Sequence, residues 1–287
     1  MDPAFFPLEP RRRQDASCGC HTHHIFRLKG GAGLGVTTLG IDLAKNLFQS
    51  HGVDERGRVA LSRRVTRSQL AEAVASLPPC VIGMEACASA HHWGRAFERF
   101  GHTVKLMSPK YVKPYVKTNK NDGRDAEAIC EAVSRPTLRF VAIETVEQAD
   151  RQALHRTRSL LVTHRTAVIN QIRGLLAEYG WVIAHSPEKV RPALVRFLDD
   201  AESGVPAYAR DTFAELYEQL TELESRLARV TERVERLFRA HPVCRKLAAV
   251  PGIGPLTATA LLAAVGRPQA FRNGRHLAAW LGLVPRQ

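Results

Sequence analysis

Four acidic residues stand where their carboxylates could act together. Asp42 ends the apolar run "TTLGID" and Glu85 ends "CVIGME", and both runs have the length and composition of short strands. Asp122 and Asp125 are three residues apart, which places both on one face of a helix. If the two strands are neighbours, four oxygen ligands can converge at one edge of a sheet. Such ligands suit Mg²⁺, and two such ions can clamp the attacking and leaving oxygens of a phosphoryl transfer.

The helical pair also has a purely structural explanation. Asp122 can cap the helix, and Asp125 can be a first-turn acid that complements the helix dipole. This explanation leaves Asp42 and Glu85 unaccounted for, because a carboxylate at the end of an apolar strand is costly unless a cation meets it. We therefore predict that all four acids are catalytic residues and metal ligands.

The charge of the chain indicates a polyanionic partner. Lys and Arg number 41 against 28 Asp and Glu, a formal net charge of +13. Residues 105–120 and 151–173 contain basic residues and no acid, as does the stretch from Arg236 to the end. Unmixed zones favour contact with a nucleic-acid backbone over a merely basic surface. The residues expected to contact nucleic acid in the first two zones are Lys110, Lys113, Lys117, Lys120, Arg156, Arg165 and Arg173, and Arg124 is expected to join them from between the zones.

The first half of the chain predicts an α/β fold. Strands are expected at 37–42, 47–53 and 58–65, with a turn at 54–57 between the last two. A helix begins after Thr66, and "CVIGME", "SAHHWGRAFERF" and "HTVKLM" then alternate as strand, helix and strand. This order predicts a mixed sheet with helices on its faces.

The second half is predicted to be helical, with long helices at about 146–179 and 207–240. In the second of these, apolar residues alternate steps of three and four from Phe213 to Leu237, which is a heptad seam. Its partner is either a second copy of the chain or the 146–179 helix folded back on it. We favour the dimerising coiled coil, and therefore a homo-oligomer.

The segment "KLAAVPGIGPLTATALLAAVG" predicts two helices joined by a tight turn. Gly252 and Gly254 allow a phosphate to approach the backbone, and Pro255 opens the second helix. The segment resembles a helix-hairpin-helix, which binds DNA backbones without reading sequence; the alternative is a helix-helix turn with no ligand. Arg272 and Arg275 are expected to add phosphate contacts, and Trp280 to belong to the core.

Other classes of protein fit the sequence poorly. Six cysteines do not resemble a disulfide framework, and no apolar run approaches the length of a membrane span. The first 36 residues lack helical or strand periodicity and the pattern of a secretory signal, so we expect a disordered extension. Its Cys and His cluster lacks a second ligand pair, and its glycine-rich stretch lacks the lysine of a phosphate-binding loop. A cytoplasmic, nucleoid-associated protein is expected.

Several blocks of the sequence resemble the insertion-sequence 110 family of DEDD transposases, including its 1111 subgroup. They are "TTLGIDLAKNLFQ", "IGMEACASAHHWGR", "SPKYVKPYVKTNKNDGRDAEAICEAV", "INQIRGLLAEYG" and "VPGIGPLTATALLAAVG" with the "FRNGRHLAAWLGLVPRQ" that follows. The resemblance implies a ribonuclease-H-like domain similar to the resolvase RuvC, whose four acids correspond to Asp42, Glu85, Asp122 and Asp125. It also implies two Mg²⁺ ions, DNA as substrate and, in some members, a bridge RNA as guide.

The resemblance divides the chain into a RuvC-like domain at 37–145, a long-helix region at 146–242 and part of a C-terminal transposase domain at 243–287. In the family, a serine beyond "WLGLVPRQ" is thought to attack the phosphodiester, whereas the last serine here is Ser225. We expect a truncated chain that carries out metal-dependent strand cleavage and exchange in transposition. The alternatives are a non-catalytic nucleic-acid-binding remnant and a RuvC-like structure-specific nuclease.

Overall fold

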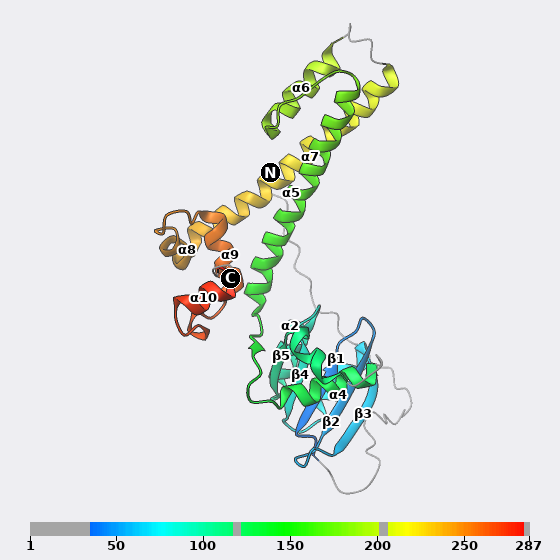
Figure 1. The fold of residues 1–287 in the computed structure, drawn as a ribbon, viewed down its shortest axis with the longest axis vertical. Helices are drawn as coiled ribbons and strands as arrows, with labels where there is room; N and C mark the ends of the chain where they lie inside the picture. Colours follow the sequence, from blue (N-terminus) through cyan, green and yellow to red (C-terminus); the bar gives the residue numbers. More distant parts are fainter. Residues whose placement is uncertain (1–34, 117–121, 201–205, 284–287) are drawn as a thin grey trace, which may run out of the picture. The chain divides into compact units, whose positions relative to one another are not determined.

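The computed structural model describes residues 35–116, 122–200 and 206–283, except for the Asp122 side chain. The chain forms two compact units, which meet in the sequence between Ile143 and Glu144. The first unit contains the sheet and the second is helical (Figure 1). The fold class is therefore an α/β sheet domain followed by helices, as predicted. The expected extension at 1–36 lies almost wholly outside the described residues.

The first unit is built on a six-stranded mixed sheet with the order β3-β2-β1-β4-β5-β6. Strands β1, β4 and β5 are parallel, whereas β2, β3 and β6 each run antiparallel to a neighbour. The strands are β1 Thr38–Asp42, β2 Leu47–Val53, β3 Val59–Thr66, β4 Val81–Glu85, β5 Thr103–Met107 and β6 Phe140–Val141. The predicted strands are confirmed, and β6 is an addition too short to show a periodicity.

The turn between β2 and β3 is held by one carboxylate. Asp54 accepts hydrogen bonds from the backbone N–H groups of Arg56 and Arg58, and from Nε of Arg58. These bonds, with the Arg58 N–H foremost, hold the pKa of Asp54 below its ordinary value against the opposing effect of burial. Gly57 closes the turn at a φ of 75°, which a residue with a side chain rarely adopts. The predicted turn is confirmed.

Helices cover the sheet because their apolar faces match it. Helix α2 buries Trp93 and Phe97, which pack near Phe48 of β2. The start of α1 is fixed by the predicted cap Thr66, in a reciprocal capping box with Gln69. The helical segments of this unit are α1 Arg67–Ala75, α2 Ala90–Arg99, α3 Pro109–Val112, the 3-10 turn η1 Lys113–Tyr115 and α4 Asp122–Val133.

Helix α4 approaches the sheet at two glycines that face each other. Gly40 of β1 is paired with Gly83 of β4. A Cβ at Gly40 would lie 2.3 Å from the carbonyl oxygen of Ala126, and one at Gly83 would lie 2.8 Å from Cβ of Val133. At Gly40 the sheet therefore meets the backbone of α4 directly, and at Gly83 it meets the Val133 side chain.

Replacing Gly40 by Ala should destabilise the protein. The added methyl meets α4 backbone atoms that cannot move aside, so we expect a loss of at least about 3 kcal/mol, the upper range for overpacking. The matched control is Gly174→Ala, because a Cβ there meets nothing within 4 Å. In urea unfolding followed by circular dichroism, the control should gain about 0.5–1 kcal/mol. Equal stabilities of the two variants would contradict the direct contact.

The second unit is organised around two long helices that lie side by side (Figure 1). Contacts join the end of α5 to the start of α7, and Arg158 of α5 donates to Thr231 near the end of α7, so the two helices are antiparallel. Helix α5 starts at the capping box of Thr145 and Gln148. The helical segments are α5 Val146–Glu178, α6 Pro187–Asp199, α7 Ala207–Ala240, α8 Pro242–Leu247, α9 Pro255–Val265, the 3-10 turn η2 Pro268–Ala270 and α10 Gly274–Trp280.

The heptad seam of α7 has its partner inside the chain. Phe213, Leu220 and Leu223 are buried in a cluster with Val168, Ile169, Ile172 and Leu176 of α5. Within one chain the seam is filled by α5, which was the alternative to the dimerising coiled coil, and a homo-oligomer stays a prediction. A heptad repeat specifies that an apolar face is covered, and leaves open which helix covers it.

Truncation at this seam should be costly. Leu220 is 1% exposed, so Leu220→Ala should lower the free energy of unfolding by about 2–5 kcal/mol through lost burial and a cavity. Leu160 of α5 is 54% exposed, and Leu160→Ala should change stability by no more than about 0.5 kcal/mol. Thermal and urea unfolding of both variants test this, and a similar effect of the two would argue against the intramolecular seam.

Two further features of the described helices bear on the predictions. Trp280 was expected in the core, yet it is 51% exposed and contacts Phe271 edge-on. The apolar stretch around it belongs to α10, a helix too short to bury every side.

Within the described ranges, we find no helix with the length and apolar character that a membrane span requires.

Candidate catalytic site and nucleic-acid surface

The register of the sheet brings Asp42 beside Glu85. Ile41 of β1 is paired with Met84 of β4 in parallel, so the next residues along both strands are these two acids. Neighbouring strands lie about 5 Å apart, which sets the spacing of the two backbone positions. Both side chains are partly buried, and both take part in interactions with other groups.

The two acids share a face of the sheet with α4. Side chains alternate along a strand, so Asp42 points to the same side as Gly40, and Glu85 to the same side as Gly83. Those glycines are the positions that α4 contacts. The carboxylates therefore emerge on the α4 side, one step beyond the helix-sheet contact.

Helix α4 begins on the side of these acids. Ala126 lies over Gly40, and one turn later the Cys130 thiol donates to the carbonyl of Thr38 at 3.7 Å. The helix therefore runs back along β1 toward its start. Its first turn, with Asp122 and Asp125, lies toward the end of β1 where Asp42 stands.

Positions 122 and 125 also continue the sheet-facing side of α4. Asp122 precedes Ala126 by four residues and Asp125 precedes Ile129 by four, and both apolar residues are fully buried. Asp125 is partly buried, while the Asp122 side chain is outside the described part. Among the residues that are described, no group of three or more His, Cys, Asp or Glu is arranged to hold a metal ion.

The pKa of one cysteine, Cys87, depends on the charges of the two strand-end acids. Cys87 follows β4, and the pKa of its thiol is raised by burial first, then by the carboxylates of Glu85 and Asp42. A negative field from two sources thus acts on one exposed thiol. Sequence reasoning missed this residue, although its place two positions after Glu85 could have pointed to it.

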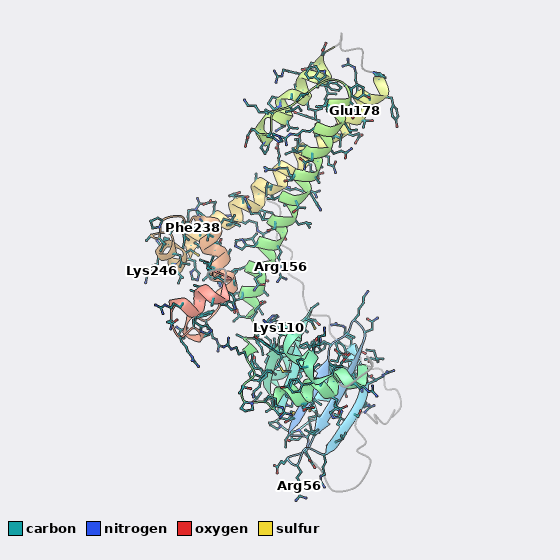
Figure 2. The ribbon with its side chains drawn as sticks, viewed as in Figure 1. Arg56, Lys110, Arg156, Glu178, Phe238 and Lys246 are labelled. Carbon is teal, nitrogen blue, oxygen red and sulfur yellow. The ribbon has the colours of Figure 1, made fainter. Side chains whose placement is uncertain are left out.

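The lysines predicted around the site are only partly described. Lys110 of α3 and Lys113 of η1 are exposed, and Lys110 lies over the Tyr111 ring, 4.9 Å from its centroid (Figure 2). Lys117 and Lys120 lie outside the described residues. Arg124 is exposed on the first turn of α4 and has a partner of its own.

The three arginines predicted on α5 have different surroundings. Arg156 is exposed and donates to Gln152 one turn earlier (Figure 2). Arg165 is half-buried, and its charge contributes to lowering the pKa of Glu188. Arg173 donates to the backbone carbonyls of Ala184 and Ser186, so it ties the segment before α6 to α5. Of the three, Arg156 is the one most open to a ligand.

The predicted glycine turn joins α8 to α9. Gly252 has a φ of 87°, and Gly254 stands at the start of α9. A Cβ on either glycine would meet nothing within 4 Å, so the turn is open to close approach. Arg272 and Arg275 are both exposed at the start of α10, where Asn273 caps the helix through the N–H of His276.

Sequence reasoning passed over a second group of arginines in the first unit. Arg63 and Arg64 are exposed on the edge strand β3, and Arg56 stands in the turn before it (Figure 2). Cations on an edge strand also discourage pairing with another sheet. The signal was available, because residues 56–71 hold five arginines and no acid, but sequence reasoning did not single out this zone.

Comparison with known proteins identifies the family. A model of the IS110-type DEDD domain, described as "Transposase", matches residues 39–180, and one described as "Transposase IS116/IS110/IS902 family" matches residues 244–287. A probable family 20 transposase of Pseudomonas aeruginosa is 44% identical over 88% of this chain and 75% of its own length. The chain belongs to the IS110 family of insertion-sequence transposases.

Other members of this family are similar over comparable lengths. The transposase for insertion sequence element IS1111A of Coxiella burnetii is 42% identical over 98% of this chain and 77% of its own length. The transposase for insertion sequence element IS1328 of Yersinia enterocolitica is 37% identical over 88% and 75%. The matched range of the first model includes Asp42, Glu85, Asp122 and Asp125. Membership in the family makes this a DNA-transposition protein of a nucleic-acid-cleaving class.

The proximity of the two strand-end acids to Cys87 can be measured chemically. Each carboxylate disfavours the thiolate and raises its pKa, so Asp42→Asn or Glu85→Gln should lower the pKa and raise the thiolate fraction at pH 8. Alkylation of Cys87 by iodoacetamide, followed by mass spectrometry of its peptide, should become a few-fold faster. Glu72→Gln on α1 is the charge-matched control and should leave the rate unchanged. Unchanged rates in both site variants would place the acids elsewhere.

Proposed function

We propose that the first unit cuts and exchanges DNA strands using divalent metal ions held by Asp42, Glu85, Asp122 and Asp125. The observation that carries the proposal is the parallel register that sets Asp42 beside Glu85, on the side of the sheet where α4 begins. Two further acids at the start of that helix supply the remaining ligands. The active domain is the RuvC-like segment expected at 37–145.

The donor set fits such ions. Carboxylate oxygens are the hard ligands that Mg²⁺ takes, and two acids on adjacent strands repel each other unless a cation lies between them. When bound, two Mg²⁺ ions would activate the attacking oxygen and stabilise the leaving oxygen of the phosphodiester. The placement of the acids on two strands and one helix gives each a rigid support.

The basic residues near the site have a role that follows from charge. A phosphodiester carries a negative charge and would be repelled by the acids alone, so the surrounding cations must offset that repulsion. Lys110 and Lys113 are exposed on the segment that leads to α4. They would bind the strand at phosphates that flank the reacting one, and so orient it without reading its bases.

We further propose that the helical unit binds nucleic acid, either element DNA or an RNA encoded by the element. Support comes from the exposed Arg156, the open turn at Gly252 and Gly254, and the exposed Arg272 and Arg275. None of these groups selects between the two nucleic acids, because phosphates are common to both.

Loss of single carboxylates tests the catalytic proposal. Asp42→Asn, Glu85→Gln and Asp125→Asn should each slow Mg²⁺-dependent cleavage of branched or element-end DNA at least about a hundredfold, since lost metal ligation removes several kcal/mol of transition-state stabilisation. Glu72→Gln should cut at the wild-type rate. EDTA should abolish cutting by the wild type and by Glu72→Gln.

A binding readout separates a lost site from a lost activity. Isothermal titration with Mn²⁺ should show uptake by the wild type and by Glu72→Gln, and much weaker uptake by Asp42→Asn and Glu85→Gln. Unaltered uptake by the two site variants, with unaltered cutting, would reject the metal assignment.

A further inference from the structure

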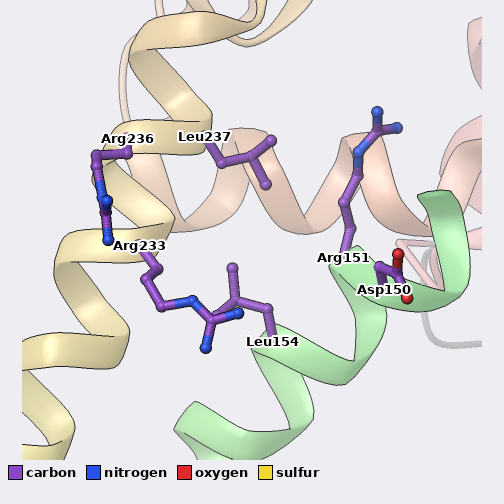
Figure 3. Close-up of a pocket in the computed structure, with 6 residues that line it drawn as sticks. All are labelled: Asp150, Arg151, Leu154, Arg233, Arg236 and Leu237. Atoms are coloured by element: carbon purple, nitrogen blue, oxygen red, sulfur yellow. The ribbon is translucent and has the colours of Figure 1, made fainter. Parts of the chain in front are cut away.

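A groove between α5 and α7 has no role in the site described above. It lies near the start of α5 and the end of α7, with a volume of about 390 Å³ (Figure 3). Its lining comes from both helices and is made of Asp150, Arg151, Leu154, Arg233, Arg236 and Leu237. All six lie in the second unit, so the groove is formed within one compact part of the chain.

The groove concentrates positive charge. Three guanidinium groups and one carboxylate line it, which leaves a net charge of +2. Arg236 lies 3.8 Å from Glu232, but both side chains are well over half exposed, so this pair is weak. Across the described part of the chain, no ion pair is found for Arg151 or Arg233.

Two other arginines of α7 have partners within the helix. Arg226 is paired with Glu222 one turn earlier, and Arg229 donates to the Ser225 hydroxyl at 2.9 Å. Both lie on α7 outside the groove. In the groove, Arg236 has only the weak pair with Glu232, and no ion pair is found for Arg233 among the described residues, so both guanidinium groups can take a ligand.

The geometry of the lining suits a phosphate backbone. Arg233 extends from α7 toward Leu154 of α5, and Arg236 lies along α7 beside it (Figure 3). Residues three apart on a helix are about 5–6 Å apart at Cβ, so the two can engage one strand together. The apolar side chains of Leu154 and Leu237 form a low-dielectric wall, which strengthens the field of the arginines. Guanidinium groups then bind phosphate oxygens in pairs.

We propose that this groove binds the sugar-phosphate backbone of a nucleic acid through Arg151, Arg233 and Arg236. The contact is independent of base sequence, because no group in the lining is placed to read a base edge. The inference rests on the proposed function only in that the partner is a nucleic acid. It does not depend on metal binding by the four acids.

The test compares two double variants of the full chain that remove equal charge from one helix. Arg233→Gln with Arg236→Gln empties the groove of its α7 cations, and Arg226→Gln with Arg229→Gln is the control. Binding to labelled duplex DNA, and separately to labelled hairpin RNA, is measured by fluorescence anisotropy in EDTA over a series of salt concentrations. The groove variant should bind roughly ten- to a hundredfold more weakly, with a salt slope smaller by about two, while the control loses much less.

A variant that binds more tightly would show that the loss of binding by the groove variant is not caused by misfolding. Asp150 is the one carboxylate in the lining, so Asp150→Asn should tighten binding several-fold and cannot do so by unfolding the protein. A loss by the groove variant with DNA alone, with RNA alone or with both supports the proposal and says which backbone occupies the groove. Equal binding by the two double variants, or no gain from Asp150→Asn, overturns it. Because binding is measured in EDTA, it does not require metal held by the four acids, so failure of the metal proposal remains distinguishable.

Discussion

The contact between α4 and the centre of the sheet determines the rest of the first unit. Gly40 and Gly83 are paired across β1 and β4, and their missing side chains let the α4 backbone approach β1 and the Val133 side chain approach β4. This close approach fixes the height and direction of α4. It therefore decides where the first helical turn stands relative to the strand-end acids Asp42 and Glu85.

Apolar packing on the other face of the sheet explains how a chain can tolerate acids so close together. Asp42 and Glu85 occupy the ends of adjacent parallel strands, where their charges repel and raise the free energy of the folded state. The core beneath them stabilises the arrangement through apolar burial of Ile41, Ile82 and Met84. The first unit thus holds an electrostatically unfavourable group of side chains on a well-packed base, a common arrangement at functional sites.

The sequence predicted the acidic edge well and the helical unit less well. Asp42 and Glu85 could be paired in advance because parallel strands that end in acids bring them to one edge. The seam of α7 could not be assigned a partner, since the repeat is the same for α5 and for a second copy. Arg233 was missed because it lies between Glu232 and Glu235 in a stretch of mixed charge, and Arg236 because only the fold brings it beside the arginines of the groove. Trp280 was misplaced because an apolar stretch does not say how much of it a short helix can cover.

The paired glycines also limit how this protein can vary over evolutionary time. Each is met by a different stretch of α4, Gly40 by Ala126 and Cys130 and Gly83 by Val133. If α4 shifted to admit a larger residue on one strand, it would lose its packing contact with the other strand. No single compensating change therefore restores the contacts with β1 and β4 together. Two residues without any functional group are therefore expected to vary little, although neither takes part in chemistry.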